Sequence, residues 1–314
     1  MVDQNGDKGM KRVTRQTTYQ HAGRYNPPAL TVGVGETVLV ETELCTGPWL
    51  QSAGDTWSPE RTLGHNPVSG PLYIAGAQPG DCLGVRIERI DVDCLGYTGF
   101  APGQNPFPDW IRQREWGIVT RTVQIRDGYI EWSPSLRLPV QPMVGVLATA
   151  PEAEVLATTR PGKHGGNLDV QEVAPGATVY LPVYVAGALL HVGDVHARQG
   201  DGEICCGGGI ETRSEVTLTI ASLGPRPARM TWPRIETADY LITCGCARPA
   251  EDAFRIAVQE LIYWLADEYR LDEREALLLL GQVLEARATQ FVDPEYTYVA
   301  KIRREYLPER RTSG

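Results

Sequence analysis

Histidine and carboxylate side chains are concentrated in one segment of the 314-residue chain. Three of its five histidines lie between Gly162 and Thr212. The same segment contains the acidic residues Asp169, Asp194, Asp201, Glu203 and Glu211. Imidazole nitrogens and carboxylate oxygens bind zinc-type metal ions, and the same groups act as general acids and bases in catalysis. The segment 162–212 is therefore the first candidate for a functional site.

An Asp-x-His pair lies within the run Leu190–Ala197, which the sequence predicts to be a β-strand. Because side chains alternate along a strand, Val192, Asp194 and His196 would share one face. A carboxylate beside an imidazole suits a Zn²⁺-type site with mixed nitrogen and oxygen ligands. The same pair is also typical of a surface contact or a buried hydrogen bond, and the glycine-rich turn 199–203 is typical of a hairpin. The residues alone leave both interpretations open.

The elements that would carry these residues are short β-strands. The chain has 33 glycines and 23 prolines, so turns are frequent. Alternating or β-branched runs between the turns occupy residues 31–44, 80–93, 143–148, 179–185 and 216–220. In the second run, Leu83, Val85 and Ile87 would face one way, and Arg86 and Glu88 the other. Short strands divided by glycine and proline indicate a sandwich or barrel.

The pattern changes to a helical period near residue 250. The pair Arg248-Pro249 places proline at the expected first position of a helix, and apolar residues recur at helical spacing as far as Arg270. Those apolar residues are Phe254, Val258, Leu261 and Leu265. Asp272 and Glu275 resemble a capping box in front of a second helix over 275–288. We expect a helical hairpin, followed by an extended tail from Phe291.

Composition excludes several classes of protein. The net charge is −9 and the pI is near 5.2, which argues against binding nucleic acid or an anionic membrane. No apolar run is long enough to span a bilayer, and no signal peptide is visible behind the polar start. The seven cysteines are poorly spaced for a disulfide framework. We therefore expect reduced thiols and a cytoplasmic protein.

Five sequence stretches resemble the acetamidase/formamidase family. The block HGGNLD at 164–169 is followed by LPVYVAGALLHVGDVHARQGDGEICCGGGIE at 181–211. The other stretches are NPVSGPLYI at 66–74 with GAQPGD at 76–81, PPALTV at 27–32 with GETV at 35–38, PVQPMVGV at 139–146 and QFVDP at 290–294. They occur in the family's order along the chain, so the resemblance covers roughly residues 25–307.

The resemblance implies a fold and an activity. Such proteins are mainly β, with a jelly-roll-like β-sandwich, a second β-rich part and a small α+β C-terminal region. We accordingly expect a polar extension over 1–24, a β-rich catalytic region over 25–235 and an α+β region over 236–314 that contains the helical hairpin. The family hydrolyses a carboxamide to a carboxylate and ammonia, and its members are homodimers or larger homo-oligomers. A divalent metal, most plausibly Zn²⁺, is implied, with a second cation such as Ca²⁺ as an option.

Roles for individual residues follow from the chemistry of amide hydrolysis. We expect Asp194, His196 and His164 to be metal ligands, because one strand face supplies only two of them. A bound metal lowers the pKa of its water from 15.7 towards about 7. Glu203 is the candidate general base, which passes the water proton to the departing nitrogen.

Further residues are expected to hold the substrate or support the metal. Asn167 and the backbone amides of Gly165 and Gly166 are candidates for holding the amide or its oxyanion, and His65 for lining the site. Residues expected to orient the ligands or to bind a second cation are Asp169, Asp201, Glu211 and Glu43.

Two stretches raise alternatives. The family strand that corresponds to 40–50 carries an aspartate, whereas here the acid is Glu43, shifted by one position. A shift by one residue turns the side chain to the other face of the strand. Either a bulge brings Glu43 back to the face of the family aspartate, or that aspartate's role is lost. The irregular loop 99–116 contains Phe100, Phe107, Trp110 and Trp116. It would act either as a lid that sets amide size or as an apolar plug against the sandwich or a partner subunit.

Three functions are compatible with these features. The first is hydrolysis of a small amide such as formamide or acetamide. The second is hydrolysis of a larger or cyclic amide, which the altered strand and the aromatic loop suggest. The third is a non-catalytic β-sandwich binding module whose cation is structural. The combination of Asp194, His196 and Glu203 argues against the third, because a structural metal site is closed by its ligands.

Overall fold

The computed structural model describes residues 10–103, 105–205, 207–269 and 271–310. Its largest sheet has nine strands in the order β1-β5-β17-β7-β15-β18-β19-β21-β20. Their bounds are β1 Lys11–Val13, β5 Thr37–Thr42, β17 Ser214–Pro225, β7 Asp81–Val92, β15 Thr178–Pro182, β18 Arg234–Glu236, β19 Tyr240–Ala247, β21 Tyr296–Arg303 and β20 Glu285–Gln290. Neighbouring strands are antiparallel, except that β1 runs parallel to β5.

A second, six-stranded sheet carries the segment that the sequence singled out. Its order is β14-β12-β16-β6-β2, with β4 paired in parallel to β6. The bounds are β14 Gly165–Asn167, β12 Met143–Ala148, β16 Leu190–His196, β6 Val68–Ile74, β2 Thr18–Tyr19 and β4 Leu30–Val32. Because β16 lies between β12 and β6, the Asp-x-His pair is in the interior of this sheet.

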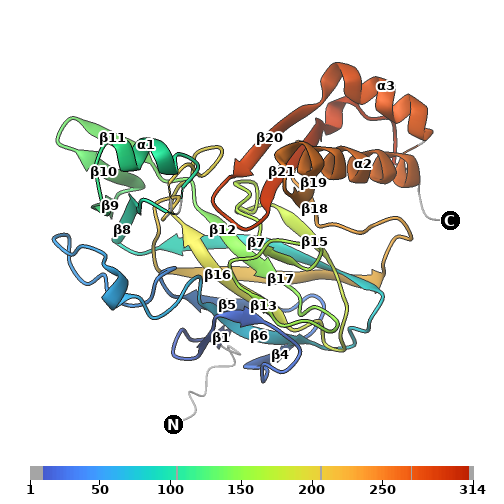
Figure 1. Ribbon diagram of the computed structural model, residues 1–314. Helices are drawn as coiled ribbons and strands as arrows, with labels where there is room; N and C mark the ends of the chain where they lie inside the picture. The colour runs from blue at the N-terminus through green and yellow to red at the C-terminus, as the bar shows by residue number, and fades with distance from the viewer. Residues whose placement is uncertain (1–9, 104, 206, 270, 311–314) are drawn as a thin grey trace, which may run out of the picture.

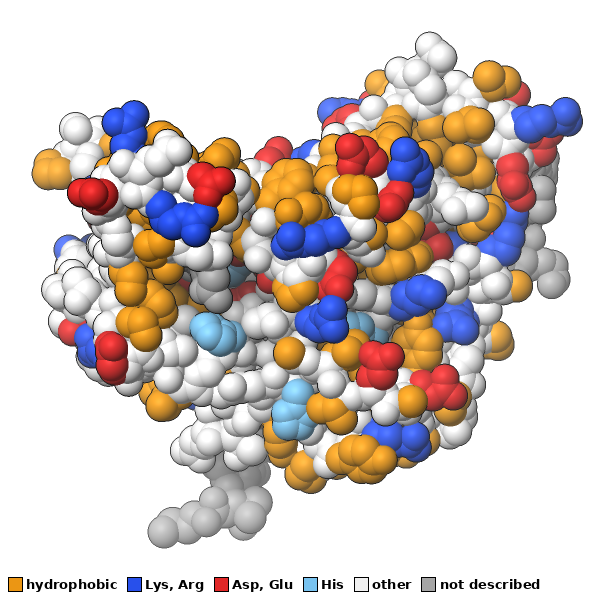
Figure 2. Space-filling view, viewed as in Figure 1, with side chains coloured by type: hydrophobic (Ala, Val, Ile, Leu, Met, Phe, Trp, Pro, Cys, Tyr) orange, Lys and Arg blue, Asp and Glu red, His pale blue; other side chains and the backbone are white. Residues whose placement is uncertain are grey.

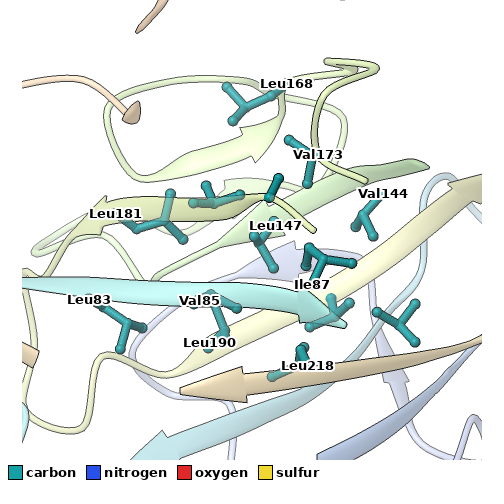
Figure 3. Packing of buried hydrophobic residues seen from close by; sticks show 14 of the residues in the cluster. Leu83, Val85, Ile87, Val144, Leu147, Leu168, Val173, Leu181, Leu190 and Leu218 are labelled. Carbon is teal, nitrogen blue, oxygen red and sulfur yellow. The ribbon is translucent and has the colours of Figure 1, made fainter. Parts of the chain in front are cut away.

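The two large sheets pack face to face and form the main core. Their inward side chains belong to one cluster, in which Val85, Leu147 and Leu218 are fully buried (Figure 3). As predicted, Leu83, Val85 and Ile87 face this core, whereas Arg86 and Glu88 on the same strand are exposed. The expected mainly β fold with a sandwich is confirmed.

Smaller elements surround the sandwich (Figure 1). A four-stranded sheet has the order β11-β10-β9-β8, and β3 pairs with β13. The bounds are β8 Leu95–Phe100, β9 Val119–Arg126, β10 Tyr129–Ser133, β11 Leu136–Pro139, β3 His21–Ala22, β13 Leu156–Ala157, the helix α1 Pro108–Gln113, and the 3₁₀ turns Pro59–Arg61 and Arg304–Tyr306. The four-stranded sheet packs through Val123 and Ile125 against Ala197 and Ile210, which flank the candidate site. It is the expected second β-rich part.

The helical hairpin is present but shorter than predicted. Helix α2 is Ala250–Glu268 and helix α3 is Glu273–Val283, and α2 packs on β19 and β21 (Figure 1). Pro249 is the N-cap of α2 rather than its first residue. The prediction that α3 continues to 288 is wrong, because residues from Glu285 form edge strand β20 against β21. Phe254 is exposed and packs its ring against Tyr298 instead of filling the core.

Strand pairing crosses both predicted boundaries. The strands β1 and β2 lie within the predicted extension 1–24 and join the two large sheets, while residues 1–9 lie outside the described residues. The nine-stranded sheet also continues through the boundary at 235/236, since β18 pairs with both β15 and β19. The division into three regions therefore stays a prediction. In the part of the chain that the structure describes, no helix is long and apolar enough to cross a membrane.

Candidate metal centre and active site

Buried acids and one imidazole meet at the end of β16. Asp194 and His196 are 3% and 0% exposed, and they are joined by three further buried acids: Asp169, Glu203 and Glu211. Metal-ligand atoms form two groups: Asp169 with His196 and Glu203, and Cys45 with Asp194 and Glu211. Within each group the atoms lie within 4.8 Å of one another. The groups are adjacent, since His196 Nε2 lies 3.2 Å from Glu211 Oε2 and 3.6 Å from Asp194 Oδ1. We call the five residues Asp169, Asp194, His196, Glu203 and Glu211 the acid cluster.

Gln199 determines which nitrogen of His196 faces the acids. Gln199 Nε2 donates to the backbone carbonyls of Asp169 and Thr289, at 3.0 Å each. Its Oε1 therefore accepts from His196 Nδ1, at 2.8 Å. In a neutral imidazole the other nitrogen, Nε2, then carries a lone pair. This is the form in which histidine binds a metal, oriented by a hydrogen bond from its other nitrogen.

The acid cluster leaves buried polar atoms without partners. Among the described residues, no hydrogen-bond partner exists for Asp169 Oδ1 and Oδ2, Asp194 Oδ1, His196 Nε2, Glu203 Oε2 or Glu211 Oε2. Unpaired buried polar atoms are costly, and unpaired buried charges more so. Carboxylate oxygens and an imidazole nitrogen are the donors that Zn²⁺ and similar ions prefer. The residues present thus fit a divalent cation.

Electrostatics lead to the same conclusion. Burial raises the pKa of Asp169 to about 7, and Asp194 adds to the effect. Burial also raises the pKa values of Glu203 and Glu211. Burial opposes a charge on His196, but Glu211 and Asp194 outweigh it and raise the pKa of the imidazole. Without a cation, these shifts favour protonated Asp169, Glu203 and Glu211 and a protonated His196, and a bound metal would displace those protons.

Three residues of the acid cluster have left-handed backbone conformations. Asp169, Asp194 and Glu203 have positive φ angles of 48°, 54° and 42°. Such residues are uncommon and gather at functional sites. Opposite Asp194 stands Gly145 of β12, where a Cβ atom would lie 2.6 Å from Asp169 Oδ1 and 2.7 Å from Asp194 Oδ2. Only glycine leaves room there for both carboxylates.

A cavity of about 400 Å³ opens onto the acid cluster. Asp194, Glu203 and Glu211 form part of its wall, together with Asn66, Asn167 and Asp293. Aromatic and apolar residues complete it, among them Trp57, Phe100, Val119, Val292 and Pro294. The molecular surface is notched between the lobe of α1 and the lobe of α2 and α3 (Figure 2), and the cavity takes wall residues from β8, β9 and the β20–β21 loop.

Several predicted site residues lie where they were expected. Glu203, Asn167, Asp194 and Glu211 line the cavity, and so does the exposed His65. Asn167 Nδ2 donates to Asp293 Oδ2 at 2.9 Å, while its Oδ1 is buried without a partner. The roles proposed for these residues stay predictions.

His164 is not brought to the acid cluster. It is absent from both groups of ligand atoms and from the cavity wall, and its ring lies over Gly162 and Gly166. The tight turn between Gly162 and Gly165 redirects the chain between His164 and Asp169, so that only the aspartate reaches the cluster. The structure thus gives no support to His164 as third metal ligand, and that role stays a prediction. Glu211 and Asp169 do have ligand atoms near His196.

Gly165 and Gly166 are not at the cavity surface. The N–H of Gly165 donates to Gly162 O at 3.1 Å, so it is not free for an oxyanion. A Cβ atom on Gly165 would collide with Leu147 O, and one on Gly166 with Arg160 O. These glycines permit close backbone packing of β14 and do not contact the cavity.

Two predicted acids point elsewhere. Glu43 Oε1 accepts from Arg213 Nε at 2.5 Å, and the side chain of Asp201 is exposed and pairs with Arg287. No bulge restores Glu43 to the site, because β5 ends at Thr42 and Cys45 reaches the acid cluster instead. The expected roles of Glu43 and Asp201 in the site are thus not supported by their positions.

Sequence reasoning missed Cys45, Asn66, Tyr97, Gln199 and Asp293. Asn66 Nδ2 donates to Asp194 Oδ2 at 3.0 Å, and it belongs to the NPVSGP stretch. Asp293 belongs to the QFVDP stretch, where burial raises the pKa of its carboxyl. Both stretches had been noted as motifs, which was the available signal. Gln199 likewise belongs to the motif stretch 181–211, whereas no spacing pattern pointed to Cys45 or Tyr97.

Comparison with known proteins identifies the family. A model of the Acetamidase/Formamidase family matches residues 9–161 and 153–302. The chain belongs to this family. The formamidase of Methylophilus methylotrophus is 46% identical over an alignment that covers 62% of this chain and 61% of that protein. The acetamidase of Mycolicibacterium smegmatis is 32% identical, with 62% and 63% covered. The chain thus spans about three fifths of the length of these curated relatives.

Solved structures of the acetamidase/formamidase family show the same fold over nearly the whole chain. An acetamidase from Bacillus halodurans superposes with a TM-score of 0.85 at 33% identity, and covers 94% of this chain and 98% of its own. An acetamidase from Yersinia enterocolitica also has a TM-score of 0.85, at 32% identity, with 97% and 95% covered.

Proposed function

We propose that this chain hydrolyses a small carboxamide, of the formamide or acetamide kind, to a carboxylate and ammonia at the acid cluster. The observation that carries the proposal is His196 Nε2, an orphaned buried nitrogen 3.2 Å from an equally orphaned Glu211 oxygen, beside a cavity of about 400 Å³. Relatives named formamidase and acetamidase support the substrate class.

A divalent metal of the Zn²⁺ type belongs to this proposal. His196 through Nε2 and Asp194 through Oδ1 would hold it, since these unpartnered atoms lie 3.6 Å apart. Asp169 would join them, because one of its oxygens lies within 4.8 Å of a ring nitrogen of His196. When bound, such an ion polarises a carbonyl oxygen and lowers the pKa of water to about 7. Gln199 keeps His196 in the ligand tautomer, and Asn66 holds the second oxygen of Asp194.

The remaining chemistry belongs to residues of the cavity wall. Glu203 takes a proton from the attacking water, whose oxygen bonds to the carbonyl carbon. Glu203 then gives that proton to the nitrogen as the C–N bond breaks, which yields ammonia and the carboxylic acid. The acid ionises to the carboxylate by losing its proton to ammonia or to water. Asn167 Oδ1 is unpartnered and lines the cavity, so it can accept a hydrogen bond from the substrate NH₂ group. These contacts orient the amide between acid and base.

Ammonia release from purified, metal-analysed protein tests the proposal. We expect hydrolysis of formamide or acetamide, loss of activity on chelation and recovery with Zn²⁺. Asp201→Asn is the matched control, because this acid of the same segment is exposed and outside the acid cluster, so the variant should keep full activity. Protein that releases ammonia from no amide, with or without added metal, would contradict the proposal.

A second candidate is a larger or cyclic amide. A cavity of about 400 Å³ exceeds the needs of formamide, and Trp57, Phe100 and Val119 provide apolar contact for a substituent. The loop 99–116 contributes Phe100 to the wall, whereas Phe107, Trp110 and Trp116 are exposed rather than plugged into the sandwich. If larger amides are preferred, Phe100→Ala should lower kcat/KM for them and leave formamide unchanged, as a panel of amides would show.

Two further expectations accompany the function. We propose a homo-oligomer, which light scattering of the purified protein would measure, and a cytoplasmic location. The described cysteines Cys45, Cys82, Cys94, Cys205, Cys244 and Cys246 are free thiols, which agrees with a reducing compartment. Cys206 lies outside the described residues. The binding-module alternative is disfavoured, because the acid cluster opens to a cavity instead of being closed.

A further inference from the structure

Cys45 reaches the acid cluster from a part of the chain far from it in sequence. Strand β5 ends at Thr42, and the following turn buries Cys45 in a small cluster with Trp49 and Tyr97. Its backbone carbonyl accepts from Asn66 N at 2.6 Å, the same residue whose side chain holds Asp194. The turn is therefore anchored directly to the wall of the cavity.

Beside the sulfur lie two unpartnered carboxylate oxygens. Ligand atoms of Cys45, Asp194 and Glu211 all lie within 4.8 Å of one another. Asp194 Oδ1 and Glu211 Oε2 have no hydrogen-bond partner among the described residues, and these residues are only 3% and 2% exposed. Buried carboxylates this close to one another repel unless a proton or a cation lies between them. The nearby donors are His196 Nε2, 3.2 Å from Glu211 Oε2, and Asn66 Nδ2, which donates to the other oxygen of Asp194.

We propose that Cys45, Asp194 and Glu211 form a second metal site and that Cys45 Sγ gives it a sulfur ligand. The site adjoins the one that His196 and Asp169 would hold, and Asp194 lies between the two. The inference rests on the proposed function only in sharing Asp194 with that first site. Two-metal sites of this kind are common in hydrolytic enzymes.

A chain of hydrogen bonds can run towards the Cys45 sulfur. Trp49 Nε1 can only donate, and it donates to Thr46 Oγ1 at 2.7 Å. Tyr97 OH lies 3.0 Å from Thr46 Oγ1 and 3.0 Å from Cys45 Sγ. The chain can therefore run in one direction, with Thr46 donating to Tyr97 and Tyr97 donating to the sulfur. A donor at this position stabilises the deprotonated sulfur, which is the form that binds a metal.

The ligand set predicts the class of ion. A thiolate beside two carboxylates suits a transition ion such as Zn²⁺ or Co²⁺, whereas Ca²⁺ and Mg²⁺ take oxygen ligands only. Binding releases the thiol proton, because the thiolate is the ligand. This site differs from the second cation that the sequence led us to expect, such as Ca²⁺: the ion is thiophilic, and of the expected residues the set contains only Glu211.

Cobalt substitution provides a readout that does not depend on activity. Metal-free full-length protein is titrated with Co²⁺ while absorbance is recorded, because thiolate-to-cobalt charge transfer gives a near-ultraviolet band. We expect two ions per chain and the band in the wild type. Cys45→Ser should lose the band and bind the second ion about tenfold or more weakly. Cys82→Ser is the control, since Cys82 contacts Met230 outside the acid cluster and should keep the band.

The outcomes separate this inference from the proposed function. One Co²⁺ per chain without the band would overturn the sulfur site and leave the first metal intact. No Co²⁺ at all would overturn both. A band that persists in Cys45→Ser would also overturn the inference. Should Cys45→Ser fail to fold, X-ray absorption of the zinc-loaded wild type decides instead: a Zn–S shell at about 2.3 Å supports the site, and its absence contradicts it.

Discussion

The position of Glu203 is compatible with two roles. It lines the cavity with a buried, unpartnered oxygen, and it also lies within 4.8 Å of ligand atoms of Asp169 and His196. This position suits a general base beside a metal, and equally a third metal ligand. The two roles predict different metal contents when Glu203 is replaced with glutamine, an amide of the same shape.

We expect Glu203→Gln to fold and to keep its metal while kcat falls on the order of 10²–10⁴-fold, because only basicity is removed. Asp194→Asn should instead lose the metal together with stability. Metal content and kcat of both variants, with substrate above KM, make the comparison. The roles are reversed if Glu203→Gln loses the metal while Asp194→Asn retains it.

Gly145 offers a test of how tightly the acid cluster is built. In Gly145→Ala the new methyl would lie 2.6 Å from Asp169 Oδ1 and 2.7 Å from both Oδ2 and the backbone carbonyl oxygen of Asp194, so the two aspartates must shift. We expect metal affinity to fall about 10–100-fold, comparable to loss of an orienting partner, and activity to fall with it. Isothermal titration with Zn²⁺ measures this. The exposed Gly103 has open space around it, so Gly103→Ala should change neither quantity.

At the scale of elements, α3 depends on a cap that responds to pH. Asp272 accepts from the backbone N–H groups of Glu275 and Arg274, at 2.9 Å each, and these bonds hold the pKa of its carboxyl below the usual value. A lowered folded-state pKa contributes stability above the unfolded pKa, near 3.9, and loses it as the pH falls through the folded value.

Asp272→Ala should therefore melt a few degrees below the wild type at pH 7, and the difference should shrink as the pH falls below 4. Asp272→Asn should retain most of the cap at pH 7, since asparagine is also a good N-cap. Thermal unfolding at both pH values measures the effect. A difference that grows towards low pH would show that the cap does not act through the ionised carboxylate.

At the scale of the whole molecule, a buried ion pair joins the helical layer to the nine-stranded sheet. Arg234 on β18 donates through Nη2 and Nε to Glu260 Oε1 on α2, at 2.7 and 2.9 Å, and both side chains are buried. Glu260 Oε2 also accepts from Thr231 N, at 3.2 Å. Neither residue lines the cavity, so the pair serves assembly of the fold.

Glu260→Gln should cost about 3–5 kcal/mol of unfolding free energy, because it leaves the Arg234 charge buried and uncompensated. The double variant Arg234→Met/Glu260→Leu should cost clearly less, since no charge remains. Urea denaturation of the metal-loaded proteins measures both, with kcat as a check that the acid cluster is intact. Equal losses in the two variants would mean that packing rather than charge dominates at this position.

Local sequence pattern was sufficient for what depends on near neighbours along the chain. Alternation along Leu190–Ala197 predicted the strand and placed Asp194 and His196 together, and their distance of 3.6 Å agrees. The cap at Asp272 and the periodicity of α2 were likewise readable. The end of α3 was not, because pairing of β20 with β21 overrode a helix-compatible sequence.

The composition of the acid cluster was decided by tertiary structure. By itself the sequence determined the strand-borne pair, the mainly β class and, through its motifs, the family. It could not determine that Cys45 and Asp293 reach that pair, nor that His164 does not, although Asp169 follows it closely in the same motif. Ligand atoms must converge within a few ångströms, and that convergence depends on long-range strand pairing and on left-handed turns. A single turn reverses which side chain points inward, so only the folded chain distinguishes a ligand from its neighbour.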